Sequence, residues 1–275
     1  MSAEGNHPWR ASSPCTPRCV THRLPAVPTM ETVRRTAALA KALTNEPATT
    51  NEPAGTDHAR LRAKAQAVLG ALGITLDHRR HDTGSLEHSR PGNAHGTGTL
   101  VVANHVSWLD IVALLAVEPV TFLAKREVAG WPFVGPWARR AGTLLLDRWS
   151  LRGLPGAVDA VAARLRAGES VAAFPEATTW CGRPGGRFRR AVFQAAVDAG
   201  APVRPVTLTY LQRGEPSTVA AFVGDDGLAA SLGRVLRARE LTVRVDTHAP
   251  LPPTADRRTL ALHAERAVHG EAAHV

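Results

Sequence analysis

A histidine and an aspartate follow an apolar run near the middle of the chain. The segment NHVSWLD, residues 104–110, places His105 and Asp110 five positions apart. Five steps of a regular helix turn the chain by about 140°, so the two side chains meet only if His105 precedes a helix that contains Asp110. Asp110 can then accept a hydrogen bond from one ring nitrogen while the other takes a proton from a hydroxyl. The pair is therefore a candidate general base that makes an alcohol nucleophilic.

The same segment also permits a purely structural interpretation. Asn104 and Ser107 are helix-capping residue types, and Asp110 is an acid suited to the first turn of a helix. The catalytic interpretation gains weight because the chain lacks a G-x-S-x-G elbow, an H-E-x-x-H motif, a P-loop and a plausible cysteine nucleophile. Of the mechanisms considered, the one that remains is a base acting directly on the hydroxyl of a bound substrate.

Short β-prone runs alternate with helical segments through the rest of the chain. The periodicity predicts strands at 99–103, 120–124, 143–147, 170–174, 203–210, 219–223 and 241–247, with helices at 106–117, 153–167, 187–199, 226–239 and 255–269. This pattern indicates an α/β fold with a mixed, mainly parallel sheet flanked by helices. Active groups in such sheets lie on loops at the carboxyl ends of strands, here the segments after Ala103, Ala124, Leu146 and Phe174.

The N-terminal part differs in composition from the rest. Residues 1–56 are rich in Pro, Thr, Ser and Asn, and they are predicted to form a flexible low-complexity leader outside the fold. Residues 57–275 are expected to form a single domain. Its first helix, 58–72, is amphipathic and ends at Gly73; it either packs on the domain or lies on a membrane surface.

The overall charge favours an anionic partner without choosing one. The formal net charge is +9, but only three of the 33 basic residues are lysines, so the abundance of arginine is weak functional evidence. The longest apolar run, 109–117, contains Asp110 and is far shorter than the roughly 20 residues of a membrane-spanning helix. The first residues lack the pattern of a secretory signal.

The three cysteines predict a reducing compartment. Cys15, Cys19 and Cys181 form no even framework of disulfides. Cys15 and Cys19, with His7 and His22 nearby, match no strong zinc-finger spacing, so no metal site is expected.

Four blocks of the chain together resemble the glycerolipid acyltransferase family, which includes 1-acylglycerol-3-phosphate acyltransferases. NHVSWLD resembles the first motif of that family. AKREVAGWPFVGPWARRAGTLLLDR at 124–148 resembles the second, FPEATTW at 174–180 the third, and APVRPV at 201–206 the fourth. The blocks appear in the family's order across residues 99–210, which makes the resemblance specific.

The resemblance implies roles for individual residues in an acyltransferase domain whose groove opens at a membrane surface. His105 would be the base and Asp110 its partner. The second block, with Lys125, Arg126 and Arg148, would bind the acceptor's phosphate, and Glu176 and Thr178 of the third would hold the glycerol or phosphate end.

Two departures from the family pattern concern the third block. Ala177 stands where the family usually has glycine, at a turn that favours positive φ. Thr179 stands where many members carry an arginine suited to bidentate phosphate contact, which leaves the acceptor open. Downstream, CGRPGGRFRR offers a Gly-rich loop that either binds an anionic head group or is an ordinary basic loop, through Arg183, Arg187, Arg189 and Arg190.

The expected function is transfer of a fatty acyl group from acyl-CoA or acyl carrier protein to the hydroxyl of a lysophospholipid, with 1-acylglycerol-3-phosphate giving phosphatidate. A lyso-ornithine lipid is the alternative acceptor, and a catalytically silent, basic membrane-binding module is the alternative class. No cofactor and no nucleic acid are expected. The protein is predicted to lie peripherally at the cytoplasmic face of the cell membrane, in contact through Trp131, Phe133 and Trp137 unless these side chains only pack a loop.

Overall fold

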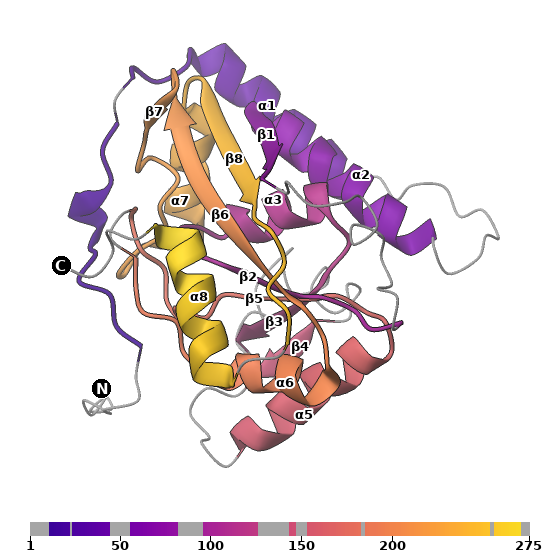
Figure 1. Ribbon diagram of the computed structural model, residues 1–275. Helices are drawn as coiled ribbons and strands as arrows, with labels where there is room; N and C mark the ends of the chain where they lie inside the picture. The colour runs from indigo at the N-terminus through magenta and orange to yellow at the C-terminus, as the bar shows by residue number, and fades with distance from the viewer. Residues whose placement is uncertain are drawn as a thin grey trace.

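The computed structural model describes residues 11–22, 24–44, 56–81, 96–125, 143–146, 153–182, 185–253 and 256–270. Within this part of the chain, an eight-stranded sheet has the order β1-β8-β6-β2-β5-β3-β4, with β7 beside β6 (Figure 1). The strands are β1 (Ile74–Arg80), β2 (Leu100–Ala103), β3 (Thr121–Lys125), β4 (Leu144–Leu146), β5 (Val171–Ala173), β6 (Val203–Gln212), β7 (Glu215–Pro216) and β8 (Leu241–Thr247).

Most neighbouring strands run parallel. β2 pairs in parallel with β5 and β6, and β3 pairs in parallel with β4 and β5. β8 is antiparallel to β6, and β1 pairs in parallel with β8 at the edge. The predicted mixed, mainly parallel sheet is confirmed, and the carboxyl ends of β2, β3 and β5 share one edge.

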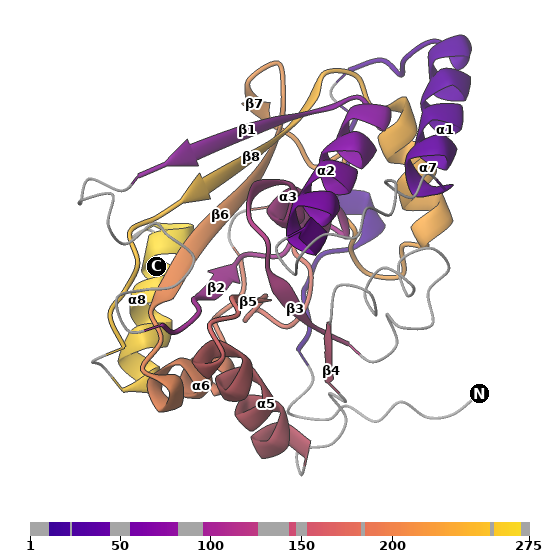
Figure 2. The same cartoon turned by 90° about the vertical axis from the view of Figure 1, so that its right-hand side faces the viewer.

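Helices cover both faces of the sheet (Figure 2). Side chains alternate along β2: Val101 and Ala103 join one buried cluster, whereas Leu100 and Val102 join the other. The first cluster includes residues of α2 (Thr56–Ala71), α3 (Leu109–Val117) and α7 (Leu228–Arg237). The second includes residues of α5 (Leu154–Arg166), α6 (Ala191–Ala199) and α8 (Arg257–His269).

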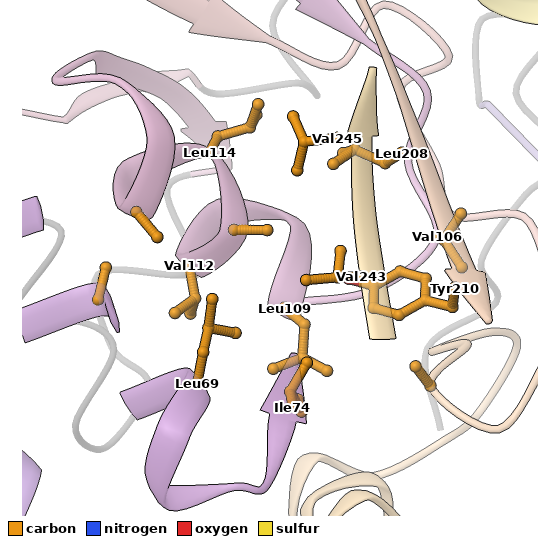
Figure 3. Packing of buried hydrophobic residues seen from close by; sticks show 14 of the residues in the cluster. Leu69, Ile74, Val106, Leu109, Val112, Leu114, Leu208, Tyr210, Val243 and Val245 are labelled. Atoms are coloured by element: carbon orange, nitrogen blue, oxygen red, sulfur yellow. The ribbon is translucent and has the colours of Figure 1, made fainter. Parts of the chain in front are cut away.

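The first cluster holds the start of α3 in place. In Figure 3, Leu109 and Val112 of α3 lie close to Leu69 of α2, and Val243 of β8 lies beside Leu109. Leu109 is fully buried. This packing sets the position of the loop that enters α3, which contains His105.

Helix α2 packs on the domain, as one of the two sequence interpretations proposed. Val68, Leu69 and Leu72 are buried in the first cluster. Gly73 follows with φ +69°, a conformation that ends the helix and that glycine adopts without strain. The apolar side of α2 is thus used for packing on α3.

Part of the segment expected to lie outside the fold belongs to it. Helix α1 (Thr29–Thr44) buries Arg35 and Leu39. The Arg35 guanidinium donates to the backbone carbonyls of Leu236 and Ala238 at the C-terminal end of α7, at 3.2 and 2.7 Å, and to Glu31 at 2.9 Å. These contacts hold α1 on the domain. A polar composition alone did not reveal them, because Arg35 and the apolar Leu39 contact segments that are distant in sequence.

Two strand predictions differ from the structure. β1 was not predicted because ITLDHRR is polar, and this edge strand is held by backbone pairing with β8 and by the Asp77–Arg244 ion pair. The strand predicted at 219–223 is wrong, because this segment forms turns. Arg234 donates to the carbonyls of Val219 and Ala221, which occupies groups that a sheet would need.

Two predicted helices begin later than expected. The helix predicted at 106–117 begins at Leu109, and the one predicted at 187–199 begins at Ala191. In both cases the preceding residues are held in an extended loop by buried carboxylates, Asp110 in the first and Glu265 in the second. Among the described residues, no helix combines the length and the apolar character needed to cross a membrane.

Candidate active site

The loop after β2 carries the candidate base. Asn104 fastens this loop to β6, because its amide nitrogen donates to the Leu208 carbonyl at 3.0 Å and its oxygen accepts from the Leu208 N–H at 2.7 Å. Asn104 therefore continues the backbone pairing between β2 and β6 and does not cap α3. The next residue, His105, is placed at the carboxyl edge of the sheet, where the sequence predicted active groups.

Asp110 binds four hydrogen-bond donors. One carboxylate oxygen, Oδ2, lies 2.8 Å from His105 Nδ1 and accepts from the backbone N–H groups of Val106 at 2.6 Å and Ser107 at 2.8 Å. The other oxygen, Oδ1, accepts from the Tyr210 hydroxyl at 2.6 Å. The side chain is fully buried. These donors offset the cost of burying a charge, and they shape the loop around the carboxylate.

The arrangement selects one tautomer of the His105 ring. Because a carboxylate only accepts, the proton of the neutral ring lies on Nδ1 and the lone pair lies on Nε2. Among the residues that the structure describes, none forms a hydrogen bond with Nε2, and the His105 side chain is 18% exposed. The ring also stacks on Phe174, with centroids 4.1 Å apart and an interplanar angle of 13°. Within the described part of the chain, His105 is thus a fixed ring whose Nε2 makes no hydrogen bond.

Glu176 supports the histidine from the loop after β5. One of its oxygens accepts from the His105 backbone N–H at 2.6 Å, and the other accepts from the Gly186 N–H at 2.8 Å. Its side chain is fully buried. A Cβ atom on Gly185 would lie only 2.4 Å from Glu176 Oε1, so this close approach requires glycine. The geometry favours a positioning role for Glu176 over the predicted contact with the glycerol or phosphate end.

The rest of the third block is tied to the same unit. The backbone N–H of Trp180 donates to the His105 carbonyl at 2.8 Å. The Thr179 hydroxyl donates to the Phe222 carbonyl, and the Phe222 N–H donates to the Val106 carbonyl at 2.9 Å. Thr179 therefore fastens two loops together and does not present its hydroxyl to a ligand.

Two neighbouring residues complete the description of this block. Thr178 is half-buried in the same loop, and its predicted contact with the glycerol or phosphate end stays a prediction. Ala177 has φ +61°, in the left-handed region that favours glycine. The turn usual for the family is therefore retained with an alanine.

The predicted phosphate-binding residues are only partly described. Arg187 is exposed on the loop before α6. Lys125 ends β3, where its backbone pairs with Leu146, but the structure does not describe its side chain. The other predicted contacts lie outside the described residues: Arg126, Arg148, Arg183 and the aromatic residues Trp131, Phe133 and Trp137.

Tyr210 is a site residue that the sequence analysis missed. Burial and the neighbouring Asp110 carboxylate raise the pKa of its phenol well above the usual value, so the hydroxyl stays a donor. It is the only tyrosine in the chain, and it lies in strand β6, four positions after the end of the fourth block. A buried phenol needs a polar partner, which is the signal that could have identified it.

The chain is similar in sequence to known acyltransferases. The family model described as "Acyltransferase" matches residues 83–209. A 1-acyl-sn-glycerol-3-phosphate acyltransferase from Neisseria meningitidis is 43% identical over 161 residues, which cover 58% of this chain and 63% of that protein. A lyso-ornithine lipid O-acyltransferase from Pseudomonas aeruginosa is 40% identical over 179 residues, which cover 64% of this chain and 69% of that protein.

A solved structure shares the fold. The 1-acyl-sn-glycerophosphate (LPA) acyltransferase PlsC from Thermotoga maritima superposes with a TM-score of 0.58 at 19% sequence identity, over 87% of this chain and 92% of that one. The match to the Neisseria protein spans less than two thirds of its length.

Proposed function

The chain belongs to the glycerolipid acyltransferase family, and we propose that it moves a fatty acyl group from a thioester donor to the hydroxyl of a lysophospholipid. The observation that carries this proposal is the pairing of His105 Nδ1 with the buried Asp110 carboxylate, which leaves Nε2 free to take a proton. A catalytically silent module would not need a histidine whose partner carboxylate is held by four hydrogen-bond donors.

The proposed reaction is a direct transfer. The acceptor hydroxyl attacks the thioester carbonyl while its proton passes to His105 Nε2. Asp110 stabilises the imidazolium that forms. The tetrahedral intermediate then collapses, the carbon–sulfur bond breaks, and the departing thiolate takes the proton back from Nε2. Base and acid are the same residue, and the protein forms no covalent intermediate.

The proposed acceptor is 1-acylglycerol-3-phosphate, which would give phosphatidate. One structural observation supports a second candidate, a lyso-ornithine lipid. Thr179 occupies the position of a phosphate-binding arginine in many members of the family, and its hydroxyl bonds to the Phe222 carbonyl. Relatives with each of these two acceptors in their names match this chain at similar identity, 43% and 40%.

The donor and the location follow from the same proposal. Acyl-CoA or acyl carrier protein would supply the acyl group, and the transfer needs no cofactor because the thioester is already activated. The net charge of +9 favours an anionic membrane surface, so we propose peripheral attachment at the cytoplasmic face of the cell membrane.

Product analysis tests the proposed function. Purified protein is offered acyl-CoA or acyl carrier protein with a panel of lysolipids that includes lysophosphatidate and lyso-ornithine lipid, and the products are identified by mass spectrometry. We expect an acylated lipid that is missing when His105→Ala replaces the wild type. A folded wild-type protein that acylates none of these lipids with either donor would contradict the proposal and favour a silent binding module.

A further inference from the structure

All the cysteines of the chain meet beside the active-site loop. Cys15 precedes the short helix η1 (Pro17–Cys19), Cys19 is its last residue, and Cys181 directly follows the third block. Their three sulfur atoms lie within 4.8 Å of one another. Cys15 Sγ and Cys181 Sγ are 3.3 Å apart although 166 positions separate them in sequence. Figure 1 shows the N-terminal segment, in indigo, running along the flank of the domain before α1.

Backbone contacts bring these thiols together. In η1 the Cys19 N–H donates to the Thr16 carbonyl at 2.9 Å, a turn that places Cys15 and Cys19 near each other. The Thr21 N–H donates to the Thr218 hydroxyl at 2.9 Å, which fastens the segment to the domain. The Cys181 N–H points to Cys15 Sγ at 3.4 Å. Cys15 and Cys181 are half-buried against the first hydrophobic cluster.

Three converging sulfurs are a poor hydrogen-bonding group but a good ligand set. Thiols are weak donors and weak acceptors, so contacts among them stabilise little. Thiolates bind zinc at about 2.3 Å, which places the sulfurs of a tetrahedral site roughly 3.8 Å apart. The observed spacings, 3.3 Å for one pair and at most 4.8 Å for the others, are compatible with this value.

We propose that Cys15, Cys19 and Cys181 form a trithiolate site for a thiophilic divalent cation of the zinc class, with the fourth position open to water. Each thiol that binds loses its proton, so one cation displaces three protons. Because bound thiols must be deprotonated, the affinity for the cation should rise with pH.

The location of this site suggests what the cation would stabilise. Trp180 precedes Cys181, and its backbone N–H donates a hydrogen bond to the His105 carbonyl. A cation bound to the three sulfurs would tie the N-terminal segment to the loop that supports the base. We expect it to raise the stability of this region, because a ligand that binds only the folded chain shifts the unfolding equilibrium.

Cadmium binding by the full chain tests the site. Reduced, metal-free protein is titrated with Cd²⁺ under anaerobic conditions, and the ultraviolet charge-transfer band of cadmium thiolate is measured. We expect one Cd²⁺ per chain, and at least a tenfold weaker affinity in each of the variants Cys15→Ser, Cys19→Ser and Cys181→Ser, as expected for the loss of one ligand of a metal site. The variant with all three substitutions contains no thiol, and it controls for binding to the 12 histidines.

The outcomes separate a metal site from other uses of the thiols. Circular dichroism checks that each variant folds, and three independent single variants guard against the failure of any one. The proposal is overturned if the reduced protein shows no charge-transfer band with stoichiometric Cd²⁺, or if Cys181→Ser binds as tightly as the wild type. It is also overturned if the reduced protein does not bind Cd²⁺ and mild oxidation instead links Cys15 to Cys181, with the loss of two hydrogens by intact mass.

Discussion

The loop that contains His105, residues 104–110, and the loop before α6, residues 185–190, differ in where their charged side chains lie. In 104–110, the buried Asp110 carboxylate binds a ring nitrogen, two backbone N–H groups and a phenol. In 185–190, Phe188 is buried, whereas the arginine side chains at 187, 189 and 190 are exposed. Acid–base chemistry requires a preorganised ring, whereas long basic side chains can adapt to the head group they meet. Acceptor preference can therefore change while the chemistry stays the same.

Removing the base should lower activity more than any other change to the two loops. General-base assistance is worth about 10²–10⁴-fold in rate, so His105→Ala should lower kcat by that factor with little change in the circular dichroism spectrum. Steady-state kinetics with the preferred lysolipid measures the loss. His263→Ala is a matched control, since His263 is exposed on α8, and it should keep wild-type turnover. Equal activity of His105→Ala and His263→Ala would show that the loop is only structural.

Removing the phenol should weaken the buried loop while leaving the base in place. Tyr210→Phe leaves Asp110 Oδ1 without its donor, which should lower the free energy of unfolding by about 1–3 kcal/mol. Urea unfolding at neutral pH measures this difference. A change below the error of the measurement would mean that the carboxylate finds another donor.

Alkaline pH should reduce the stabilisation that the Tyr210–Asp110 hydrogen bond provides. The pKa of Tyr210 is raised in the folded chain, so its contribution is fully present below the pKa of an unfolded tyrosine, about 10, and is lost as the pH rises above it. The stability difference between wild type and Tyr210→Phe should therefore shrink above that pH. Because the chain has a single tyrosine, tyrosinate absorption should appear only on unfolding. Titration of the native protein at the ordinary tyrosine pKa would contradict the buried hydrogen bond.

Changing the two predicted phosphate-binding residues, Lys125 at the end of β3 and Arg187 in the loop before α6, should affect binding more than chemistry. If lysophosphatidate is the acceptor, Lys125→Ala and Arg187→Ala should each raise KM. The increase should correspond to a loss of about 1.5–3 kcal/mol of binding free energy, the value of one charge-assisted hydrogen bond. Arg237→Ala, an exposed arginine on α7, is the matched control. Unchanged KM values together with a preference for a lyso-ornithine lipid would exclude phosphate recognition by these two residues and leave the roles of His105 and Asp110 intact.

The smallest expected effect lies in the turn between the two loops. Ala177→Gly should raise the free energy of unfolding by about 1 kcal/mol, because a left-handed conformation costs an L-residue about that much. Ala163→Gly, at an exposed position inside α5, should lower it by about 0.5–1 kcal/mol. Opposite signs in urea unfolding would confirm the strain at Ala177, and destabilisation by both glycines would contradict it.

Sequence reasoning predicted the pairing of His105 with Asp110 better than the attachments around the pair. The separation of His105 from Asp110 and the strand before them were enough to predict the pair, because both are local features of the chain. Tyr210, Glu176 and Arg35 act through contacts with distant segments, and periodicity carries no information about such partners. The convergence of Cys181 with Cys15 was missed for the same reason.

Direct attack by the acceptor hydroxyl is tested most directly by intact-mass analysis during a single turnover. Wild-type protein is mixed with excess thioester donor, first alone and then with lysolipid, and quenched at intervals shorter than one catalytic cycle. We expect acylated lipid to form with the second mixture and the protein mass to stay unchanged in both. Accumulation of an acylated serine or cysteine, formed and consumed at the rate of turnover, would show that His105 activates a protein nucleophile and would contradict direct transfer.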